Sequence, residues 1–421
     1  MLTFFSIFGR TMEEVVITGM GCVSALGNTP ELLWNNLLEG KSGLATIDRF
    51  DVTNYPIKIA AAVKEFDGSE YISPRDSSRL SRCIQYAVYA SYQALKNAGI
   101  SPENEDPTRS GVIIGSGIGG MQIYSDSVVA LSNRGPSRVS PFFIPMSIVN
   151  MPAGEVSNRT GWMGPCYAVV SACATSNHSI AAAYDQIRLG RADIMLAGGT
   201  DETVNNVALA GFTSMKALSK RNDDPTTASR PFDKDRDGFV IGEGSGILVL
   251  ESLSHAKKRG ANILARVAGI GMSADAHHMS APREDGEGVR LAIEMALREA
   301  GISPKDVGYV NTHGTSTPLG DVAECSALEK VFAGATDSLK VNSSKCMIGH
   351  ALGAAGALEA IITVKSLQNQ MIHATTNVFN QDERIHLDVC ANKNTSHSFN
   401  YAMSDSFGFG GQNSVLLLGR N

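Results

Sequence analysis

The chain contains one cysteine whose setting is that of a nucleophile. Cys173 follows the apolar residues 168–170 and opens the small-residue stretch ATSNHSIAAAYDQIRL. A strand that turns into a helix here holds the thiol at the helix N-terminus, where the dipole and free N–H groups lower a thiol pKa and can receive an oxyanion. A buried, inert thiol is the commoner state of a cysteine. We predict that Cys173 is a nucleophile, and that the structural thiols are Cys22, Cys83, Cys325 and Cys390.

Two histidines in the second half of the chain lie in matching glycine-rich contexts. His313 ends an apolar run in NTHGTST, and His350 opens a small-residue segment after SSKCMIG. If the two halves are related by a pseudo-two-fold axis, Cys173 and both imidazoles face one cavity. Lys345 belongs to the same turn as His350 and would stay charged beside them. A thiol, two imidazoles and an ammonium group are therefore predicted to form one site.

The elements that must position these residues occur twice. Residues 86–102 and 289–304 each combine helical spacing with Ala-Gly-Ile-Ser-Pro, and a short apolar strand with a Gly-containing turn follows each of them. Residues 166–190 and 339–364 both run strand, Ser-rich turn and long small-residue helix. Strands that alternate with helices at this spacing indicate βαβ units and parallel sheets. We therefore predict an α/β fold of two duplicated halves, each a helix-flanked sheet.

The predicted halves follow one another without a linker and pack as one body. We expect an N-terminal extension at residues 1–13, a half with the nucleophile cysteine at 14–258, and a half with the two histidines at 259–421. Residues 120–163 and 205–236 have no counterpart in the second half. Such insertions are the usual place for interfaces and substrate contacts.

Composition excludes several classes of protein. The 36 Lys and Arg against 42 Asp and Glu give a net charge of −6, which excludes a sequence-wide basic footprint for nucleic acid. No apolar run approaches the ~18 residues of a membrane span. Seven scattered cysteines without C-x-x-C spacing indicate neither disulfides nor a zinc site and favour a reducing compartment, the cytoplasm first and an organelle second. Arg10 is the only base in the extension, which disfavours a targeting peptide; we expect a disordered segment, with Met12 as an alternative start.

Two motifs imitate ligand-binding signatures. GSGIGG at residues 115–120 fits the dinucleotide pattern G-x-G-x-x-G, but no acidic residue follows at the required distance of about 20 positions. DKDRDG at residues 233–238 fits the first half of a calcium loop, but Gly244 stands where a bidentate Glu is required. We predict a turn of close backbone approach for the first motif and a charge-rich turn before a strand for the second.

The candidate residues belong to longer motifs that resemble one family. Over residues 14–419 the chain resembles the β-ketoacyl-acyl-carrier-protein synthases, condensing enzymes of fatty-acid elongation in the thiolase superfamily. The resemblance rests on VITGMGCVSALG, SPFFIPMSIVNMPAG, SACATSNHSI, AGGTDE, ASRPFDKDRDGFVIGEGSG, NTHGTSTPLGD, SSKCMIGHALGAAGALE and SFGFGGQNS. It implies a thiolase-like five-layer αβαβα fold. Ile118 matches the acyl-pocket position of the long-chain elongating type.

The resemblance implies a decarboxylative Claisen condensation in two half-reactions. Cys173 takes an acyl chain from acyl carrier protein as a thioester. Malonyl-acyl carrier protein then loses CO2, and its carbanion attacks the acyl thioester to give a 3-oxoacyl chain two carbons longer. His313 and His350 donate hydrogen bonds to the enolate-like oxygen that CO2 loss leaves, and the N–H groups of Cys173 and Phe409 hold the acyl-transfer oxyanion.

The resemblance assigns further roles within the site. Lys345 organises the site, and Glu359 is its buried acid. Other matched positions are the gating residues Phe407 and Phe409, the pantetheine-binding residues Thr315, Thr317 and Ser280, and the acyl-pocket residues Ile118 and Phe212. No metal or organic cofactor is needed, because phosphopantetheine arrives covalently on the carrier protein.

Departures from the family pattern concern a cation and not the thiol or the imidazoles. The family can hold a structural monovalent cation near Asn311, Glu359 and the segment before Ser406. Here Ser404-Asp405 stands where Asn is common before Ser406, which puts the cation ligands in doubt. Thr312 also replaces the usual Ala before His313.

The resemblance implies two macromolecular partners, an acidic acyl carrier protein and a second copy of the chain in a homodimer. An acidic carrier requires a basic docking patch despite the net charge of −6. The candidate docking residues are Lys216, Lys220 and Arg221, with Arg75, Arg79 and Arg82.

Three alternatives share parts of this pattern. A ketosynthase of polyketide assembly has every catalytic motif, and the stand-alone length of the chain favours fatty-acid synthesis over it. A degradative thiolase uses a second cysteine and a single histidine near the site, so the two histidines disfavour it. A non-catalytic chain-length partner would keep the fold but lack the nucleophile, so Cys173 disfavours it.

Overall fold

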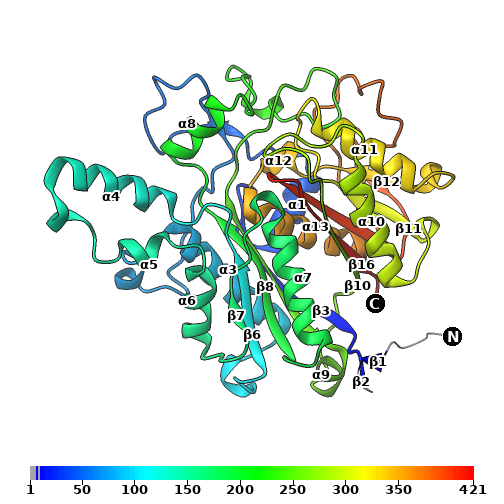
Figure 1. The fold of residues 1–421 in the computed structure, drawn as a ribbon, viewed down its shortest axis with the longest axis horizontal. Helices are drawn as coiled ribbons and strands as arrows, with labels where there is room; N and C mark the ends of the chain where they lie inside the picture. Colours follow the sequence, from blue (N-terminus) through cyan, green and yellow to red (C-terminus); the bar gives the residue numbers. More distant parts are fainter. Residues whose placement is uncertain (1–5, 8–9) are drawn as a thin grey trace.

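The computed structural model describes residues 6–7 and 10–421, and its core is one ten-stranded sheet (Figure 1). The first half of the chain contributes β3 (Val15–Val23), β6 (Ser110–Gly115), β7 (Cys166–Tyr167), β8 (Ile194–Asp201) and β9 (Gly244–Ser252). The second half contributes β10 (Ala265–Ala274), β11 (Val307–Asn311), β12 (Lys340–Asn342), β15 (Tyr401–Gly408) and β16 (Gln412–Gly419).

Both halves arrange their strands in the same order. The first half runs β7-β6-β8-β9-β3 across the sheet and the second runs β12-β11-β15-β16-β10, so corresponding strands occupy corresponding places. The first strands of the two halves, β3 and β10, pair antiparallel through residues 15–17 and 265–267 and make the sheet continuous. The predicted duplication is therefore confirmed.

The prediction of parallel sheets is wrong for part of each half. β6 is parallel to β7 and β8, and β11 is parallel to β12 and β15. β9, however, is antiparallel to β8 and β3, and β16 is antiparallel to β15 and β10. The reason is local in the second half, because residues 409–411 join β15 to β16 as a tight hairpin with positive φ at Gly410 and Gly411.

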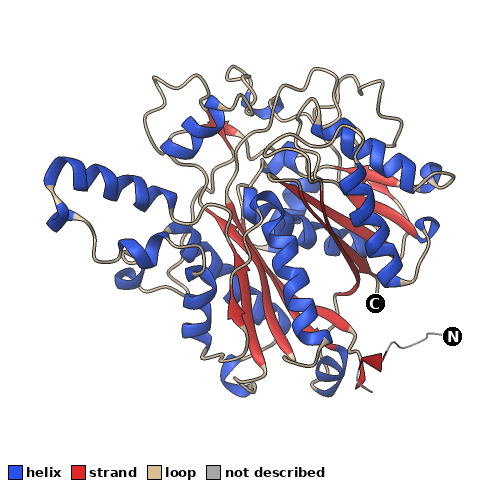
Figure 2. Cartoon of the chain, viewed as in Figure 1, coloured by secondary structure: helices blue, strands red, loops and turns tan. Residues whose placement is uncertain are grey.

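Long helices lie on the outer faces of the sheet and between its two halves (Figures 1 and 2). They are α3 (Arg82–Ala98), α6 (Met151–Thr160), α7 (Thr175–Arg188), α10 (Glu287–Ala300), α11 (Gly320–Val331) and α13 (Ala355–Asn369). α3 and α6 cover the outer face of the first half-sheet, and α10, with α11 beside it, covers that of the second. α7 and α13 pack on each other and on strands of both halves, so they form the central layer. The αβαβα fold is confirmed.

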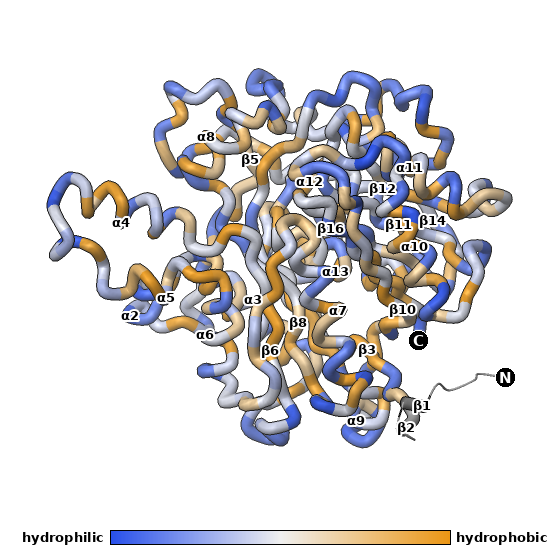
Figure 3. Tube along the Cα trace, in the orientation of Figure 1, coloured by the Kyte–Doolittle hydropathy of each residue, from blue (hydrophilic) through white to orange (hydrophobic). Residues whose placement is uncertain are grey.

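The sequences of these helices and strands explain how they pack. α13 is buried on nearly all sides because its residues are mostly small or apolar, as a helix between the two halves of the sheet requires. Gly21 in β3 and Gly271 in β10 let the outer helices approach closely, since a Cβ at either position would overlap the carbonyl oxygen of Ala90 or Ala292. Hydrophobic residues follow β3, β6 and β8 through the core (Figure 3).

Most of the two predicted insertions lies outside the repeated layers, and α6, which covers the first half-sheet, is the exception. Residues 120–163 form α4 (Met121–Arg134), α5 (Phe143–Ser147) and α6, and α4 and α5 extend away from the body of the molecule (Figure 1). Residues 205–236 include α8 (Asn206–Ser214).

Short elements complete the described chain. They are β1 (Ser6–Ile7), β2 (Arg10–Thr11), α1 (Pro30–Leu38), β4 (Ala45–Thr46), β5 (Ile59–Ala60), α2 (Pro74–Ser77), α9 (Leu253–Lys258), α12 (Lys345–Ile348), β13 (Met371–Ile372) and β14 (Thr395–Ser396). Part of the predicted disordered extension, residues 1–5 and 8–9, lies outside the described residues. In the described part β1 pairs antiparallel with β2, so disorder is the wrong prediction there. Across residues 6–7 and 10–421, no helix is both long and apolar enough to cross a membrane.

Candidate active site

Cys173 lies in a strained turn between β7 and α7. The 3-10 turn Ala172–Ala174 leads directly into α7, and Ala172 has a φ of +50°, in the left-handed region. The Ser171 N–H donates a hydrogen bond to Thr175 Oγ1 at 2.9 Å and closes the turn. The Cys173 side chain is thereby held at the start of α7 and is 6% exposed.

The second half repeats this turn without the thiol. Leu352 has a φ of +46° in the 3-10 turn Leu352–Ala354, which leads into α13. Gly353 therefore occupies the place that matches Cys173. His350 lies just before this turn, where its N–H donates to Val240 O at 2.8 Å. The duplicated framework thus supplies a nucleophile from one half and an imidazole from the other.

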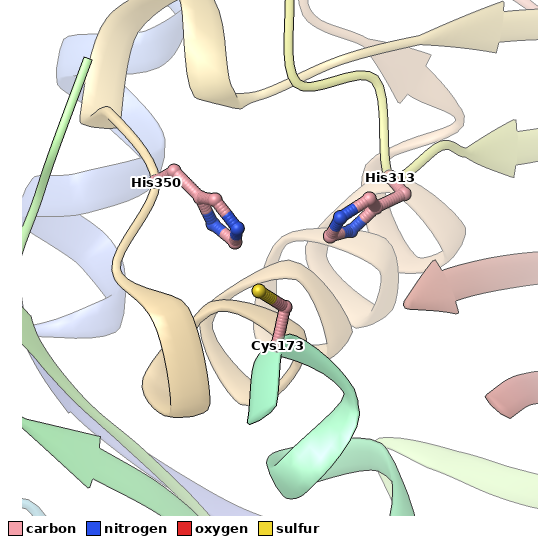
Figure 4. A group of neighbouring side chains, drawn as sticks. All are labelled: Cys173, His313 and His350. Carbon is pink, nitrogen blue, oxygen red and sulfur yellow. The ribbon is translucent and has the colours of Figure 1, made fainter. Parts of the chain in front are cut away.

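The two histidines and the cysteine converge as the sequence predicts (Figure 4). Cys173 Sγ and one ring nitrogen from each of His313 and His350 all lie within 4.8 Å of one another. The imidazole centroids are 5.2 Å apart with ring planes at 85°. Phe407 packs against the His313 ring at 5.6 Å, and Phe239 packs against the His350 ring at 5.3 Å. Aromatic side chains thus fix both imidazoles beside the sulfur.

Glu324 fixes the backbone at His313. This α11 carboxylate accepts the His313 N–H at 2.7 Å and the Gly314 N–H at 2.8 Å. Burial raises the pKa of Glu324 to about 8, and the two N–H groups act in the opposite direction. Sequence reasoning missed Glu324, although an acidic residue eleven positions after His313 was a usable signal.

Burial sets the ionisation of the three converging groups. Burial and the charge of Lys345 hold the pKa values of His313 and His350 well below their ordinary range, so both imidazoles are neutral near pH 7. Burial also raises the pKa of the Cys173 thiol to about 12, although Lys345 and the Phe409 N–H oppose it. The predicted lowering of the thiol pKa is therefore wrong in direction, because lost hydration outweighs the helix N-terminus.

Lys345 is a buried cation next to the site. It is 1% exposed and its Nζ atom forms an ion pair with Glu359 Oε1. Burial raises the pKa of Glu359 to about 7, and the charge of Lys345 opposes this change. The structure therefore pairs Lys345 with Glu359, the two residues that the resemblance assigns to organising the site and to its buried acid.

Two buried carboxylates near this ion pair have oxygen atoms without a protein partner. Among the described residues, no hydrogen bond reaches Glu359 Oε2 or either carboxylate oxygen of Asp405. Burial, reinforced by the charges of Glu324 and Glu359, raises the pKa of Asp405 well above its ordinary range. Oxygen atoms are the donors that hard cations take, so the residues present fit the structural cation that the resemblance implies.

A cavity of about 520 Å³ opens onto Cys173. It brings together most residues that the resemblance assigns to substrate, namely His313, His350, Phe212, Ser280, Thr315, Thr317, Phe407 and Phe409. Ile118 is not part of this lining. Its side chain packs in the same apolar cluster as Phe212 and Met121. In this conformation the cavity therefore ends before the expected acyl-pocket residue.

Asp201, at the end of β8, organises the GSGIGG turn. Its carboxylate accepts the N–H groups of Gly117 at 3.0 Å, Ile118 at 3.2 Å and Gly353 at 2.7 Å. A bound nucleotide phosphate would need such N–H groups to be free. The turn is therefore a close approach of backbones, as predicted. Sequence reasoning did not single out Asp201, although the motif AGGTDE contains it.

The DKDRDG segment forms a turn that supports the loop containing Thr315 and Thr317. Arg236 donates to Thr317 O at 2.9 Å and to Pro318 O at 2.8 Å, and it forms an ion pair with Asp382 at 2.8 Å. Asp233 accepts the backbone N–H groups of Asp235, Phe379 and Asn380. These contacts agree with the predicted charge-rich turn and give Arg236 a positioning role that the sequence alone did not indicate.

Comparison with known proteins identifies the family. Residues 12–256 match the model of the β-ketoacyl synthase N-terminal domain, and residues 264–379 match that of the C-terminal domain. The chain belongs to the β-ketoacyl synthase family. Among curated β-ketoacyl synthases it is 49% identical to the 3-oxoacyl-[acyl-carrier-protein] synthase 2 of Vibrio cholerae, over 97% of this chain and 99% of that protein. It is 46% identical to the chloroplastic 3-oxoacyl-[acyl-carrier-protein] synthase I of Arabidopsis thaliana, over 96% of this chain and 86% of that protein.

Solved β-ketoacyl synthase structures share the fold. A β-ketoacyl synthase from Burkholderia phymatum superposes with a TM-score of 0.91 at 34% identity, over 97% of this chain and all of that chain. A type II polyketide ketosynthase in complex with its acyl-carrier protein gives the same TM-score at 31% identity. The expected class of enzyme, an acyltransferase that condenses acyl chains in fatty-acid synthesis, is confirmed, and the polyketide alternative is not favoured.

Proposed function

We propose that Cys173, His313 and His350 carry out the two half-reactions of a 3-oxoacyl-[acyl-carrier-protein] synthase. The observation that carries this proposal is their convergence within 4.8 Å at the inner end of one cavity. In the first half-reaction the Cys173 sulfur attacks the thioester of an acyl carrier protein, forms the acyl-enzyme and releases the carrier thiol. The thiol must lose its proton as it attacks, because burial keeps it protonated in the free enzyme, and this proton ends on the departing carrier sulfur.

Backbone N–H groups hold the oxyanion of acyl transfer. The Phe409 N–H faces the sulfur of Cys173, whose own N–H is the second donor at the start of α7. Gly408 permits this approach, because a Cβ there would overlap Ser171 O. Such fixed donors stabilise the tetrahedral intermediate without reorganisation.

The two neutral imidazoles serve the second half-reaction. Malonyl-acyl carrier protein loses CO2, and negative charge develops on the thioester oxygen of the resulting enolate. Each neutral imidazole can donate one N–H toward that oxygen, and the buried site strengthens both hydrogen bonds. The carbanion then attacks the acyl carbon on Cys173, the C–S bond breaks, and a 3-oxoacyl chain two carbons longer leaves on the carrier.

Lys345 provides the positive charge of this site. It lies close enough to lower the pKa values of both histidines and of Cys173. Glu359 holds Lys345 in place through the buried ion pair. We assign Lys345 to organising the catalytic groups and Glu359 to positioning Lys345. A monovalent cation on the free oxygen atoms of Glu359 and Asp405 would add to this support.

The cavity gives each part of the substrate a place. Thr315, Thr317 and Ser280 line the route by which a pantetheine arm would reach Cys173. The acyl chain would extend past Phe212 toward Ile118. Because Ile118 does not line the cavity, a path between the two residues would have to open. Phe409 packs 6.5 Å from Phe212, so movement of the glycine-flanked segment with Phe407 and Phe409 would open that path.

An acidic acyl carrier protein is proposed to bind at the opening of the cavity. Lys216 lines the cavity and is exposed, and Lys220 and Arg221 follow it along the chain. A second basic group comprises the exposed residues Arg75, Arg79 and Arg82. Positive charge at the mouth would steer an acidic carrier toward Cys173.

A second copy of the chain is the other proposed partner. α4 and the segment after it expose several apolar side chains, of which Tyr124 and Ile144 are each 57% exposed. β7 ends the ten-stranded sheet nearby and exposes Tyr167. An apolar surface of this kind beside an open strand edge is typical of an interface. Light scattering should give the mass of a dimer for the wild-type protein. Tyr124→Asp puts a charge into the proposed interface and should give the mass of a monomer.

Two further assignments complete the proposal. The boundary between the halves is placed between residues 258 and 259, after α9 and before β10, with residues 1–13 as an extension. The compartment is placed in the bacterial cytoplasm, where free thiols persist; all seven cysteines lie in the described chain and are free.

Separate measurement of the two half-reactions tests the proposed roles. Transfer of a labelled acyl group from carrier to enzyme reports the first, and ketoacyl product reports the second. His350→Ala should abolish condensation while leaving a measurable rate of acyl transfer. Equal loss of both steps would contradict the division of roles. His386→Ala replaces an exposed histidine outside the cavity lining; it is the matched control and should change neither step.

A further inference from the structure

The three catalytic side chains present a set of donor atoms with a second chemical capacity. Cys173 Sγ and a ring nitrogen each from His313 and His350 lie within 4.8 Å of one another, and all three residues are buried (Figure 4). Thiolate sulfur and imidazole nitrogen are the ligands that Zn²⁺ takes, at about 2.3 Å and about 2.0–2.1 Å in a tetrahedral arrangement. Side-chain movements of about 1 Å would bring the three atoms to that spacing.

Both imidazoles have nitrogen atoms available for a ligand. Nδ1 of His313 and Nδ1 of His350 are buried and have no hydrogen-bond partner in the described protein. The cavity leaves room for water as a fourth ligand, the pattern of an open zinc site.

The charged residues around the three donor atoms limit the affinity for Zn²⁺ but do not prevent its binding. Lys345 repels a cation, but Glu359 neutralises it in the buried ion pair. Asp201 lies close enough to act electrostatically on the Cys173 thiol. A thiolate formed on binding removes one of the two positive charges of the ion.

We propose that the free enzyme binds one Zn²⁺ through Cys173, His313 and His350 and is thereby blocked from acyl loading. The S–H bond of Cys173 breaks, a Zn–S bond forms, and the proton passes to the buffer, with no change of oxidation state. An acyl group on Cys173 removes the sulfur ligand, so zinc and acyl chain exclude each other. The inference extends beyond the proposed function, since binding is measured without turnover.

Titration calorimetry with ZnCl2 tests the site directly. Wild-type protein should bind one Zn²⁺ per chain, and Cys173→Ala and His350→Ala should each weaken binding by at least about tenfold. Cys166→Ala removes an exposed thiol outside the cavity and should bind like wild type. Titration in two buffers of different ionisation enthalpy should reveal about one released proton per ion. Equal affinity of wild type and Cys173→Ala, or no binding by wild type, would overturn the proposal.

Cobalt substitution keeps the test decisive if a variant folds poorly. Co²⁺ bound to wild-type protein should give a thiolate-to-cobalt charge-transfer absorption that disappears after alkylation of Cys173. A cobalt spectrum without that band would exclude the sulfur ligand. Condensation is assayed separately in chelator-treated buffer, so a failure of zinc binding and a failure of the proposed function are distinguishable.

Discussion

Asp201 accepts a hydrogen bond from the Gly353 N–H at 2.7 Å, across the junction of the two halves. Gly353 lies in the turn that follows His350, at the place that matches Cys173 in the duplicated framework. The same carboxylate accepts the Ile118 N–H at 3.2 Å. One buried side chain therefore fixes both the turn of the proposed acyl pocket and the turn beside a catalytic histidine.

Asp201→Asn should impair condensation more than acyl transfer. The amide NH2 group would face backbone N–H groups, and each buried donor left without an acceptor costs about 1–3 kcal/mol. We expect the condensation kcat to fall by roughly tenfold or more, since each 1.4 kcal/mol corresponds to a factor of ten, and the acyl-length preference to broaden. Glu202→Gln is the matched control, because this neighbouring buried carboxylate accepts the Cys83 N–H instead. A variant that is less stable but has wild-type kcat and product lengths would assign Asp201 to folding alone.

Ile118→Trp should shorten the chains that the enzyme accepts. Ile118 packs in the same apolar cluster as Phe212, where a larger side chain would fill the space that a long acyl chain needs. Acyl transfer from the longest carriers should fall by roughly tenfold or more, while short acyl groups transfer normally. A series of acyl lengths measures this, with Leu32→Trp on the exposed face of α1 as the control. An unchanged length profile would place the acyl chain elsewhere.

Glu359→Gln should destabilise the protein strongly. It leaves the buried Lys345 ammonium group without its partner, and breaking a buried ion pair in this way costs about 3–5 kcal/mol. The free energy of unfolding in urea measures the loss. Glu39→Gln removes an exposed ion pair with Lys41 and should cost about 0–1 kcal/mol. Similar losses in both variants would mean that Lys345 finds another partner.

Stability should decrease as pH rises through the folded-state pKa of His255. Its imidazole lies 2.6 Å from Glu251 and 3.2 Å from Glu105, and the hydrogen bond to Glu251 raises its pKa. A raised folded pKa gives stability that is complete below the unfolded pKa of about 6.5 and is lost above the folded pKa. Glu251, whose pKa is lowered to about 2, gives stability that is lost only as pH falls below its unfolded value of about 4.3.

Urea midpoints measured from pH 6 to pH 9 test this dependence. Wild type should lose stability across that range, and His255→Gln should show a flatter profile. His386→Gln replaces an exposed histidine and should keep the wild-type slope. A slope that survives in His255→Gln would assign the effect to another group.

The sequence predicted most of the fold and the centre of the site, because both depend on local signals. The Cys173 turn and the Leu352 turn arise from similar short segments, and their convergence follows once the halves are duplicated. The direction of β9 was not predictable in the same way, since residues 202–243 separate it from β8 and leave either direction open. The hairpin at residues 409–411 did carry a signal for an antiparallel pair.

Other features depend on three-dimensional packing that a sequence does not reveal. The pKa of Cys173 depends on how completely the surrounding chain removes water, and that effect exceeds the helix N-terminus. Asp201 meets Gly353 across 152 positions of sequence, so no local pattern pairs them. Ile118 is absent from the cavity lining and packs in the same apolar cluster as Phe212, an arrangement that depends on residues far away in the sequence.

The most direct test of the account is the mass of the enzyme after acyl transfer. Wild-type protein incubated with an acyl carrier protein should gain the mass of one acyl group, and peptide mapping should locate it on Cys173. Cys166→Ala should be acylated like wild type, whereas Cys173→Ala should gain no mass and form no ketoacyl product. Acylation of Cys173→Ala, or ketoacyl product made by it, would contradict the central claim.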